Sequence, residues 1–442
     1  MGNKVALHNL GCKVNAYEIE AMQQLLEEAG YEIVPFEPGA DIYVINTCTV
    51  TNIADRKSRQ MLHKAKKMNP EAIVVATGCY VQTGGEKLEK DEAIDLVLGN
   101  NQKINIVEAL AEYAENKPGH GSHVIKINQT KEYEELSIDR TAEHVRAYIK
   151  VQDGCNQFCT YCIIPYARGR VRSRNIESVL KEVRALAEKG YKEVVLTGIH
   201  LSSYGVDFPE EKKETLLSLI RAVHEIEGIR RIRLGSLEPG IVTREFAEGI
   251  AALPKVCPHF HLSLQSGCDE TLERMNRRYR SEEYRERCEL LREVYGNPAL
   301  TTDVIVGFPQ ESEEEFRKSY DFVDSIRFYE THIFKYSRRQ GTKAAAMDGQ
   351  LTEAEKSFRS EKMIELHHRH AGDYEKSMLG KNLEVLIEEE YTKDGRTWYL
   401  GHSREYIKTA VPKSEAYGVN DIVIVKAEGF LEEHIMTGEA VE

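Results

Sequence analysis

The stretch RAYIKVQDGCNQFCTYC (residues 146–162) joins an apolar strand to a loop that carries three cysteines. In βα-barrels the loops that follow the strands build the active site. Cys155, Cys159 and Cys162 are one thiol short of the four protein ligands that zinc sites and ordinary cubane iron–sulfur clusters take. The stretch therefore predicts either a distant fourth ligand or a metal position left open for a small molecule.

Five further apolar segments follow this strand at intervals typical of repeated strand–helix units. They predict a partial barrel of six parallel strands, rather than eight, in a domain spanning residues 144–373. The segments are EVVLTG (193–198), RIRLGS (231–236), HFHLSLQSG (259–267), TTDVIVGFP (301–309) and THIFKYS (331–337).

The rest of the chain predicts two other domains. Residues 1–115 alternate near-continuous apolar strands with helical patterns, which indicates an α/β domain with a parallel sheet covered on both faces. Residues 116–143 are polar and predict a linker. Residues 374–442 contain short strands split by turn residues, which is typical of a small all-β domain. The expected fold class is α/β with this small all-β addition at the carboxyl end.

A second set of three cysteines lies in the first domain. Cys12, Cys48 and Cys79 each stand at or just beyond the carboxyl end of a predicted strand, in NLGCKVN, NTCTV and TGCYVQ. Ligands bind outside those strand ends in open parallel sheets, so we expect the three thiols to converge on a second cubane with one open iron. The alternative is that small buried thiols stand near strand ends by chance.

Length and composition indicate a soluble multidomain protein. The chain has 442 residues, of which 41% are hydrophobic and 30% charged, and no run suggests a membrane span or a signal peptide. We therefore expect a cytoplasmic location and no membrane partner, and in that reducing compartment the nine cysteines are not expected to form disulfides. Cys257, Cys268 and Cys288 match no ligand motif and are interpreted as structural.

The formal net charge of −13 argues against nucleic-acid binding, but the charged residues are unevenly distributed and some stretches of the chain are basic. Basic runs at 54–70, 167–174 and 230–233 predict either local phosphate-binding patches or ordinary solvated faces. In the last domain Trp398, Tyr399, Tyr406 and Lys408 predict either contacts with RNA or, for the aromatic residues, the core of the small barrel.

The loop CNQFCTYC resembles the C-x3-C-x-aromatic-C motif of radical S-adenosylmethionine (SAM) enzymes, with Tyr161 in the aromatic place. The resemblance implies that Cys155, Cys159 and Cys162 hold a [4Fe–4S] cluster whose fourth iron binds SAM. One electron from that cluster then cleaves SAM to a 5′-deoxyadenosyl radical, while the protein positions the reactants and excludes water from the site. A zinc site completed by a distant ligand remains the alternative.

Further stretches resemble SAM-contacting segments of the same enzymes. LTGIH (196–200) resembles the segment that lies near the methionine amine of SAM in those enzymes. LSLQSG (262–267) resembles the segment near the ribose, and DVIVGFPQES (303–312) resembles the segment near the adenine. Gln310 replaces the second glycine of the usual GFPGE. The contacts implied are Tyr161, Thr197, Gly198, Gln265, Gly307 and Phe308, and no side chain is identified as a general base.

The whole chain resembles the methylthiotransferases, which combine an amino-terminal three-cysteine domain, a radical SAM partial barrel and a carboxy-terminal TRAM domain. The resemblance implies two [4Fe–4S] clusters, with Cys12, Cys48 and Cys79 holding the second. One SAM methylates sulfur at that cluster, and a second yields the radical that activates the substrate carbon. It also implies a small electron donor such as flavodoxin or ferredoxin; the sulfur donor stays open.

NLGCKVNAYE resembles most closely the branch that acts on N6-threonylcarbamoyladenosine at position 37 of tRNA. The isopentenyladenosine branch tends to have GCQMN here, and the branch that modifies a ribosomal-protein aspartate has GCPKN. The resemblance implies C2 methylthiolation of that adenosine and binding of the tRNA anticodon loop. Alternatives are the other two substrates, or a zinc-stabilised RNA-binding protein without redox activity.

Overall fold

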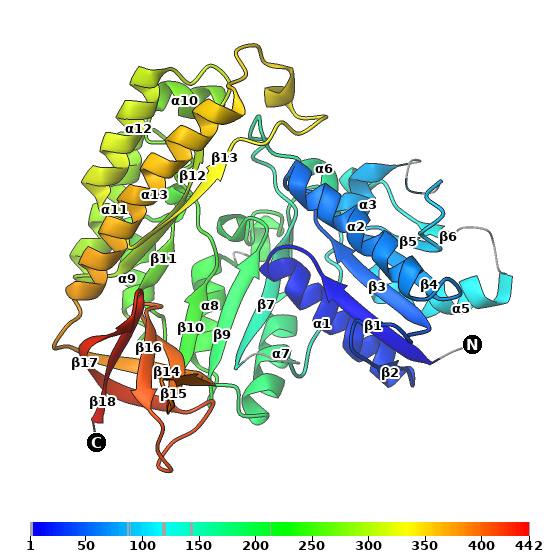
Figure 1. Cartoon of the computed structure of the whole chain (residues 1–442), viewed down its shortest axis with the longest axis horizontal. Coiled ribbons are helices and arrows are strands. Elements are labelled where there is room, and N and C mark those ends of the chain that lie inside the picture. Colours follow the sequence, from blue (N-terminus) through cyan, green and yellow to red (C-terminus); the bar gives the residue numbers. More distant parts are fainter. Residues whose placement is uncertain are drawn as a thin grey trace.

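The protein is seen in a computed structural model that describes residues 3–85, 88, 90–116, 121–141, 145–212 and 214–441. Figure 1 shows an amino-terminal α/β unit beside an open barrel, with a small closed β-barrel at the carboxyl end of the chain. This arrangement confirms the predicted fold class. Among the described residues, no helix combines the length and apolarity needed to cross a membrane.

The amino-terminal unit is a six-stranded parallel sheet in the order β2-β1-β3-β4-β5-β6. Alternate residues of its central strand β3 pack on opposite faces of the sheet. Val44 packs in the apolar cluster formed with α1 and α5, and Tyr43 packs in the apolar cluster formed with α2. Burial on both faces explains the near-continuous apolar strands. The elements are β1 (Lys4–Asn9), α1 (Lys13–Glu28), β2 (Glu32–Ile33), β3 (Ile42–Thr47), α2 (Asn52–Met68), β4 (Ile73–Gly78), α3 (Cys79–Gly84), β5 (Leu96–Leu98), α5 (Ile106–Asn116) and β6 (Gly121–His123).

Residues 116–143, predicted as a linker, are packed at several points against the two domains that they connect, although most of the described residues stay exposed or half-buried. Strand β6 adds a sixth strand to the sheet, and Leu136 and Ile138 are buried in the barrel's core cluster. The hydroxyl of Tyr17 on α1 donates to the Leu136 carbonyl at 2.6 Å. The polar composition hid this because much of the packing uses backbone groups. Residues 117–120, 142 and 143 of this stretch lie outside the described residues.

The barrel has the six predicted parallel strands. One hydrogen-bonded sheet ends at β10 and the next begins at β11, and isolated parallel bridges such as Leu237 to Leu262 join them. A short strand, β8 (Arg172–Ser173), pairs antiparallel with β7 and was not predicted. The six parallel strands are β7 (Arg146–Asp153), β9 (Glu193–Gly198), β10 (Arg231–Leu234), β11 (His259–His261), β12 (Ala299–Val306) and β13 (Glu330–Lys335).

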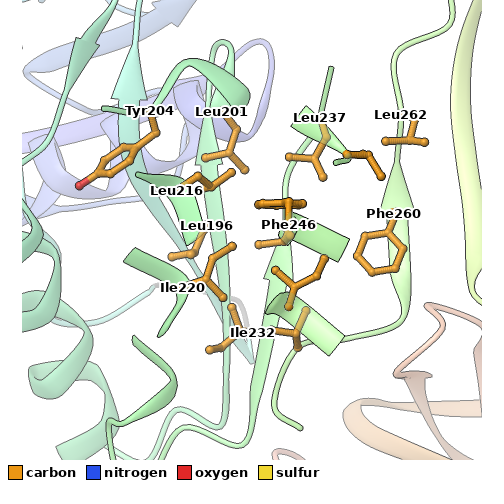
Figure 2. Close-up of a cluster of buried hydrophobic side chains, with 14 of the residues drawn as sticks. Leu196, Leu201, Tyr204, Leu216, Ile220, Ile232, Leu237, Phe246, Phe260 and Leu262 are labelled. Carbon is orange, nitrogen blue, oxygen red and sulfur yellow. The ribbon is translucent and has the colours of Figure 1, made fainter. Parts of the chain in front are cut away.

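Helices cover the outer face of the barrel. Several begin behind a Ser, Thr or Asn whose side chain accepts a hydrogen bond from the first turn, as Ser312 does for α12. Figure 2 shows the resulting core, in which Leu196, Ile232 and Phe260 of three strands meet helix side chains. The covering helices are α7 (Ile176–Glu188), α8 (Leu216–His224), α9 (Arg244–Ala251), α10 (Asp269–Arg274), α11 (Ser281–Tyr295), α12 (Glu313–Ile326) and α13 (Glu353–Lys376). The short helix α6 (Ile164–Arg168) instead contacts α3 of the amino-terminal unit.

The carboxy-terminal strands form a closed barrel in the order β14-β15-β16-β18-β17. Trp398 and Tyr399 are only 9% and 7% exposed and pack in two separate apolar clusters on opposite faces of β15, so the core alternative holds for both residues. Lys408 lies 3.6 Å from Glu389. The strands are β14 (Asn382–Lys393), β15 (Arg396–Ser403), β16 (Lys408–Pro412), β17 (Ile422–Glu432) and β18 (Ile435–Val441). Short 3₁₀ turns at 103–105, 127–129, 201–203, 210–212, 239–241 and 343–346 complete the elements.

Two of the three basic runs are neither solvated faces nor free patches. In the run 230–233, Arg231 and Arg233 are buried, pair with Glu193, and donate to carbonyls of the small barrel. Tyr406 lies beneath the Arg233 guanidinium, 4.7 Å from it, and belongs to the same interface. In the run 167–174, Arg168, Arg172 and Arg174 are buried as well. Only the run 54–70 keeps most of its cations in solvent, along α2.

Candidate metal centres

Cys155, Cys159 and Cys162 lie on the loop between β7 and α6. Cys155 and Cys159 are 9% and 8% exposed, and the Cys162 amide donates to the Cys159 carbonyl at 3.0 Å. Gly154 precedes them with φ +72°, and a Cβ there would lie 1.8 Å from the Arg170 carbonyl oxygen. Only glycine fits this turn, which brings the thiols back over the end of the strand.

An arginine and a glutamate that the sequence did not single out stand behind this loop. Arg277 donates to Cys159 Sγ at 3.2 Å and pairs with Glu238 at 2.8 Å. Glu238 also lies 3.2 Å from His200 Nε2. These groups come from loops far apart in the chain, so no local spacing could reveal them. A donor aimed at a ligand sulfur orients it and adjusts the potential of a bound cluster.

The thiols of Cys155 and Cys162 resist ionisation in the absence of a cation. Burial, with smaller effects from neighbouring cysteines, raises the pKa of Cys155 to about 11 and that of Cys162 to about 12. A bound metal ion supplies the positive charge that converts such thiols to thiolates. Three thiols on one short loop, with Cys155 and Cys159 buried and Cys162 half-buried, are therefore a donor set that fits iron.

The predicted SAM contacts all lie at the carboxyl edge of the barrel strands. The rings of Tyr161 and Phe308 pack edge to face, with centroids 6.4 Å apart. Thr197 and Gly198 end β9, and a Cβ on Gly198 would lie 2.9 Å from that of Gln152. Among the described residues, no ring contact or shared apolar cluster joins Thr197, Gly198 or Gln265 to the Tyr161–Phe308 pair.

Two of these positions have unusual backbone. Gln265 has φ +69°, a left-handed conformation that side chains other than glycine rarely adopt. Gly307 has φ +71°, and a Cβ there would lie 2.4 Å from Lys356 Cγ. Such strained turns cluster at ligand sites in general.

The other set of cysteines, Cys12, Cys48 and Cys79, converges at one edge of the amino-terminal sheet. Cys12 caps α1, Cys48 follows β3, and Cys79 begins α3 directly after β4. A Cβ on Gly11 would lie 3.3 Å from the Cβ of Cys48, so these two loops touch. Burial raises the pKa of Cys48 to about 11, and the charges of Cys79 and Cys12 add to that rise. The predicted convergence is thus seen in the fold.

Arg168 connects the two sets of cysteines. Its guanidinium donates to Cys79 Sγ at 3.2 Å and pairs with Glu18 at 2.5 Å and with Asp153 at 3.3 Å. Asp153 stands two residues before Cys155, while Glu18 lies on the helix that Cys12 caps. Lys103 and Lys150 also pair with Glu18, at 3.0 and 2.8 Å. This buried cluster fixes the amino-terminal sheet against the barrel.

Removing the central carboxylate of this cluster is expected to destabilise the protein strongly. Glu18→Gln leaves three buried cations short of a counter-charge, which costs about 3–5 kcal/mol of the free energy of unfolding. Urea titration measures it, with the exposed Glu28→Gln as the matched control. Equal unfolding midpoints for the two variants would contradict this account of the interface.

The same carboxylate gives that stability a defined pH dependence. Burial alone would raise the pKa of Glu18, but Arg168, Lys103 and Lys150 together hold it well below its usual value. A lowered native pKa means that the contribution is complete above the unfolded pKa of about 4.3 and falls as pH drops through the native pKa. We therefore expect the difference between the natural protein and Glu18→Gln to be constant near neutrality and to shrink in acid.

Comparisons with known proteins agree with this arrangement. Residues 149–323 match the family model of the Radical SAM superfamily, and residues 4–99 match uncharacterized protein family UPF0004. The threonylcarbamoyladenosine tRNA methylthiotransferase MtaB of Bacillus subtilis (strain 168) is 41% identical over 424 residues, 96% of this chain and 93% of that protein. Its counterpart in Aquifex aeolicus (strain VF5) is 44% identical over 387 residues, 88% and 93% of the two chains.

A solved structure shows the same fold at low identity. The radical S-adenosylmethionine methyltransferase TsrM of Kitasatospora setae superposes with a TM-score of 0.57 at 19% identity, over 76% of this chain and 75% of that one. A [4Fe–4S] cluster and SAM are the cofactors of the radical SAM enzymes. Identities of 41% and 44% over most of the chain confirm the resemblance drawn from the cysteine motifs. This chain belongs to the radical SAM methylthiotransferases that modify tRNA.

Proposed function

We propose that this enzyme methylthiolates C2 of N6-threonylcarbamoyladenosine at position 37 of tRNA, with two [4Fe–4S] clusters. The observation that carries the proposal is the pair of three-cysteine sets, each at the carboxyl edge of its own parallel sheet. Arg168, which touches Cys79 and pairs with Asp153 beside the other set, holds them in one unit. Three thiolates leave one iron of each cluster free for another ligand.

In this proposal Cys155, Cys159 and Cys162 bind the cluster that receives SAM, and Cys12, Cys48 and Cys79 bind the other. When bound, the two clusters supply the electron that cleaves SAM and an iron that holds the transferred sulfur. Arg277 orients the Cys159 sulfur, and Arg168 orients that of Cys79. The Arg168 side chain is fully buried and that of Arg277 is only 6% exposed, which limits competition from water for the sulfurs.

The SAM contacts are proposed at the strand ends described above. Thr197, Gly198, Gln265 and Gly307 offer backbone or polar side-chain groups there. Phe308 is fully buried against Met275 and Tyr336, so it would contact SAM through its backbone and position Tyr161 through its ring. These roles come from the family resemblance and from the placement of each residue.

Two features support the choice of substrate. GCKVN around Cys12 matches the threonylcarbamoyladenosine branch, and both relatives above carry that substrate in their names. A base in an anticodon loop is single-stranded and reaches a pocket without breaking a duplex. We propose that the enzyme works in the cytoplasm and receives electrons from a small donor such as flavodoxin or ferredoxin.

The test uses anaerobically reconstituted enzyme with SAM, reductant and a sulfur source. One tRNA carries N6-threonylcarbamoyladenosine at position 37 and a second carries isopentenyladenosine there. Mass spectrometry of the digested nucleosides is expected to show the methylthio product from the first tRNA only. Product from the isopentenyl tRNA alone would assign the enzyme to the other branch, and no product from either would remove tRNA as the substrate.

The exposed cations of α2 are expected to bind phosphates of the anticodon stem. This helix begins shortly after Cys48, and its solvent face carries Arg56, Lys57, Arg59, Lys64 and Lys67. Replacing Lys64 and Lys67 with glutamine should weaken tRNA binding uniformly across sequences. It should also reduce the slope of log K against log salt by about 2, one unit per lost phosphate contact. An unchanged salt slope in a filter-binding titration would exclude this face.

A further inference from the structure

Lys13 presents a cation without a direct partner beside the second set of cysteines. It follows Cys12, begins α1, and is exposed. In the part of the chain that the structure describes, no ion pair or side-chain hydrogen bond is recorded for its ammonium. That ammonium nevertheless lies close enough to feel the charges of Arg233 on β10 and Glu330 on β13. The side chain therefore reaches from the amino-terminal domain toward the barrel strands.

The barrel face opposite its hydrophobic core is polar where Lys13 approaches. Leu300 and Val304 of β12 pack outward into the helix-covered core, so Asp303 between them faces inward. His261 Nε2 lies 3.3 Å from Asp303 Oδ2, and the His332 ring stacks on that of His261 with centroids 5.6 Å apart. These three residues occupy neighbouring strands on one face, with His332 exposed.

Lys13 and this polar face belong to one region. Helix α1, which Lys13 begins, packs against β7 and β9 of the barrel. Burial has the largest effect on the pKa values of His332, Glu330 and His259, on β13 and β11, and the Lys13 ammonium is near enough to make a smaller, lowering contribution to each. Two other cations lie nearby. Arg233 is already engaged by Glu193 and by carbonyls of the small barrel, and Arg146 pairs with Glu193 and Glu388. Of these three described cations, Lys13 is thus the one that keeps its charge available for a ligand.

The proposed substrate needs such a cation. A threonylcarbamoyl group carries a carboxylate, a hydroxyl and urea N–H donors, whereas an isopentenyl group is a hydrocarbon. A carboxylate leaves water at high cost unless a cation or several donors receive it. We propose that the ammonium of Lys13 binds the carboxylate of the threonylcarbamoyl group, with His332 beside it. This inference rests on the proposed function and assigns the side chain that selects its substrate.

The position of Lys13 along the chain suits this role. C2, which receives the sulfur, and N6, which carries the threonylcarbamoyl group, are separated only by N1 and C6 of the same ring. The residue that binds the group must therefore stand within a side chain's reach of the sulfur-holding cluster, and Lys13 adjoins the proposed ligand Cys12. GCKVN differs from GCQMN and GCPKN at positions 13 and 14, and neither of those two motifs has a cation at position 13.

The test compares equilibrium binding of three anticodon stem–loop RNAs to the reconstituted enzyme by fluorescence anisotropy. Position 37 carries adenosine, N6-threonylcarbamoyladenosine, or the latter with its carboxylate converted to a primary amide. The natural enzyme is expected to prefer the carboxylate RNA over the amide RNA by about tenfold or more, as for a charge-assisted hydrogen bond. Equal affinity of the natural enzyme for these two RNAs would overturn the proposal without any variant.

Variants then assign the effect to Lys13. Lys13→Gln should bind all three RNAs alike and retain the affinity of the natural enzyme for the adenosine RNA, while Lys13→Arg should restore the preference. Lys4→Gln, an exposed change at the amino end of β1, is the matched control and should alter nothing. A Lys13→Gln enzyme that still prefers the carboxylate RNA would overturn the assignment.

The two levels of the argument fail in different ways. If the natural enzyme makes no methylthio product from threonylcarbamoyl tRNA, the proposed function fails. If it makes that product but its preference for the carboxylate survives Lys13→Gln, then only the role of Lys13 fails. Iron content measured on each variant confirms that the change next to Cys12 has not removed a cluster.

Discussion

Replacing Cys159 with alanine is expected to abolish the cleavage of SAM to 5′-deoxyadenosine. Cys159 stands between the other two cysteines of its loop and receives the Arg277 hydrogen bond at 3.2 Å. Loss of groups that merely support a metal ligand costs about 10- to 100-fold in affinity or activity. Loss of one of only three ligands should cost more, because two thiolates hold the cluster weakly or in an unproductive form.

The measurement is deoxyadenosine formed from SAM and dithionite under anaerobic conditions. Cys268→Ala is the matched control, because Cys268 is also buried but matches no ligand motif, and its thiol lies 3.0 Å from Glu270. We expect the control to keep the rate of the natural enzyme and Cys159→Ala to fall to background. Full deoxyadenosine production by Cys159→Ala would refute its assignment as a ligand.

Replacing Cys48 with alanine is expected to separate the two halves of the reaction. Cys48 follows β3 in the amino-terminal sheet, while the loop proposed to serve SAM follows β7 in the barrel. The variant should therefore still cleave SAM within a few-fold of the natural rate, yet form no methylthio nucleoside. Both products are measured in one reaction with threonylcarbamoyl tRNA, so that a general loss of folding is visible as loss of both.

The outcome at Cys48 also distinguishes a ligand from a structural thiol. A structural role predicts parallel decreases in SAM cleavage and in sulfur transfer, together with lower stability. A variant that still makes methylthio product would show that Cys48 does not hold the second cluster. Cys268→Ala again serves as the control for the loss of a buried thiol.

Local spacing carried most of what the sequence could predict. The three cysteines of residues 155–162 lie on one loop, so their proximity needs no knowledge of the fold. Cys12, Cys48 and Cys79 required one further step, that parallel strands end at the same edge of a sheet. The six barrel strands were likewise visible because apolar residues recur in each of them, either in a run as in EVVLTG or alternating with polar residues as in RIRL and HFHLSL.

Interactions between distant segments were not predictable in this way. Arg168 and Arg233 stand in basic runs that suggested surface charge, but their partners Glu18 and Glu193 come from other elements. The number of charged residues in a stretch of sequence does not show which of them form ion pairs with distant residues. A buried arginine differs from an exposed one only in its surroundings in the folded protein. Arg277 gave no signal at all, since its target Cys159 lies more than a hundred residues away. Lys13 became informative only once α1 was placed beside the barrel.

The most direct test of the account is iron and sulfide analysis of the anaerobically reconstituted protein. The natural chain should contain about eight irons and about eight sulfides. Replacing all three cysteines of either set with alanine should leave about four of each. Zinc bound without visible absorbance, or about four irons in the natural chain that persist when Cys12, Cys48 and Cys79 are replaced, would contradict the two-cluster site.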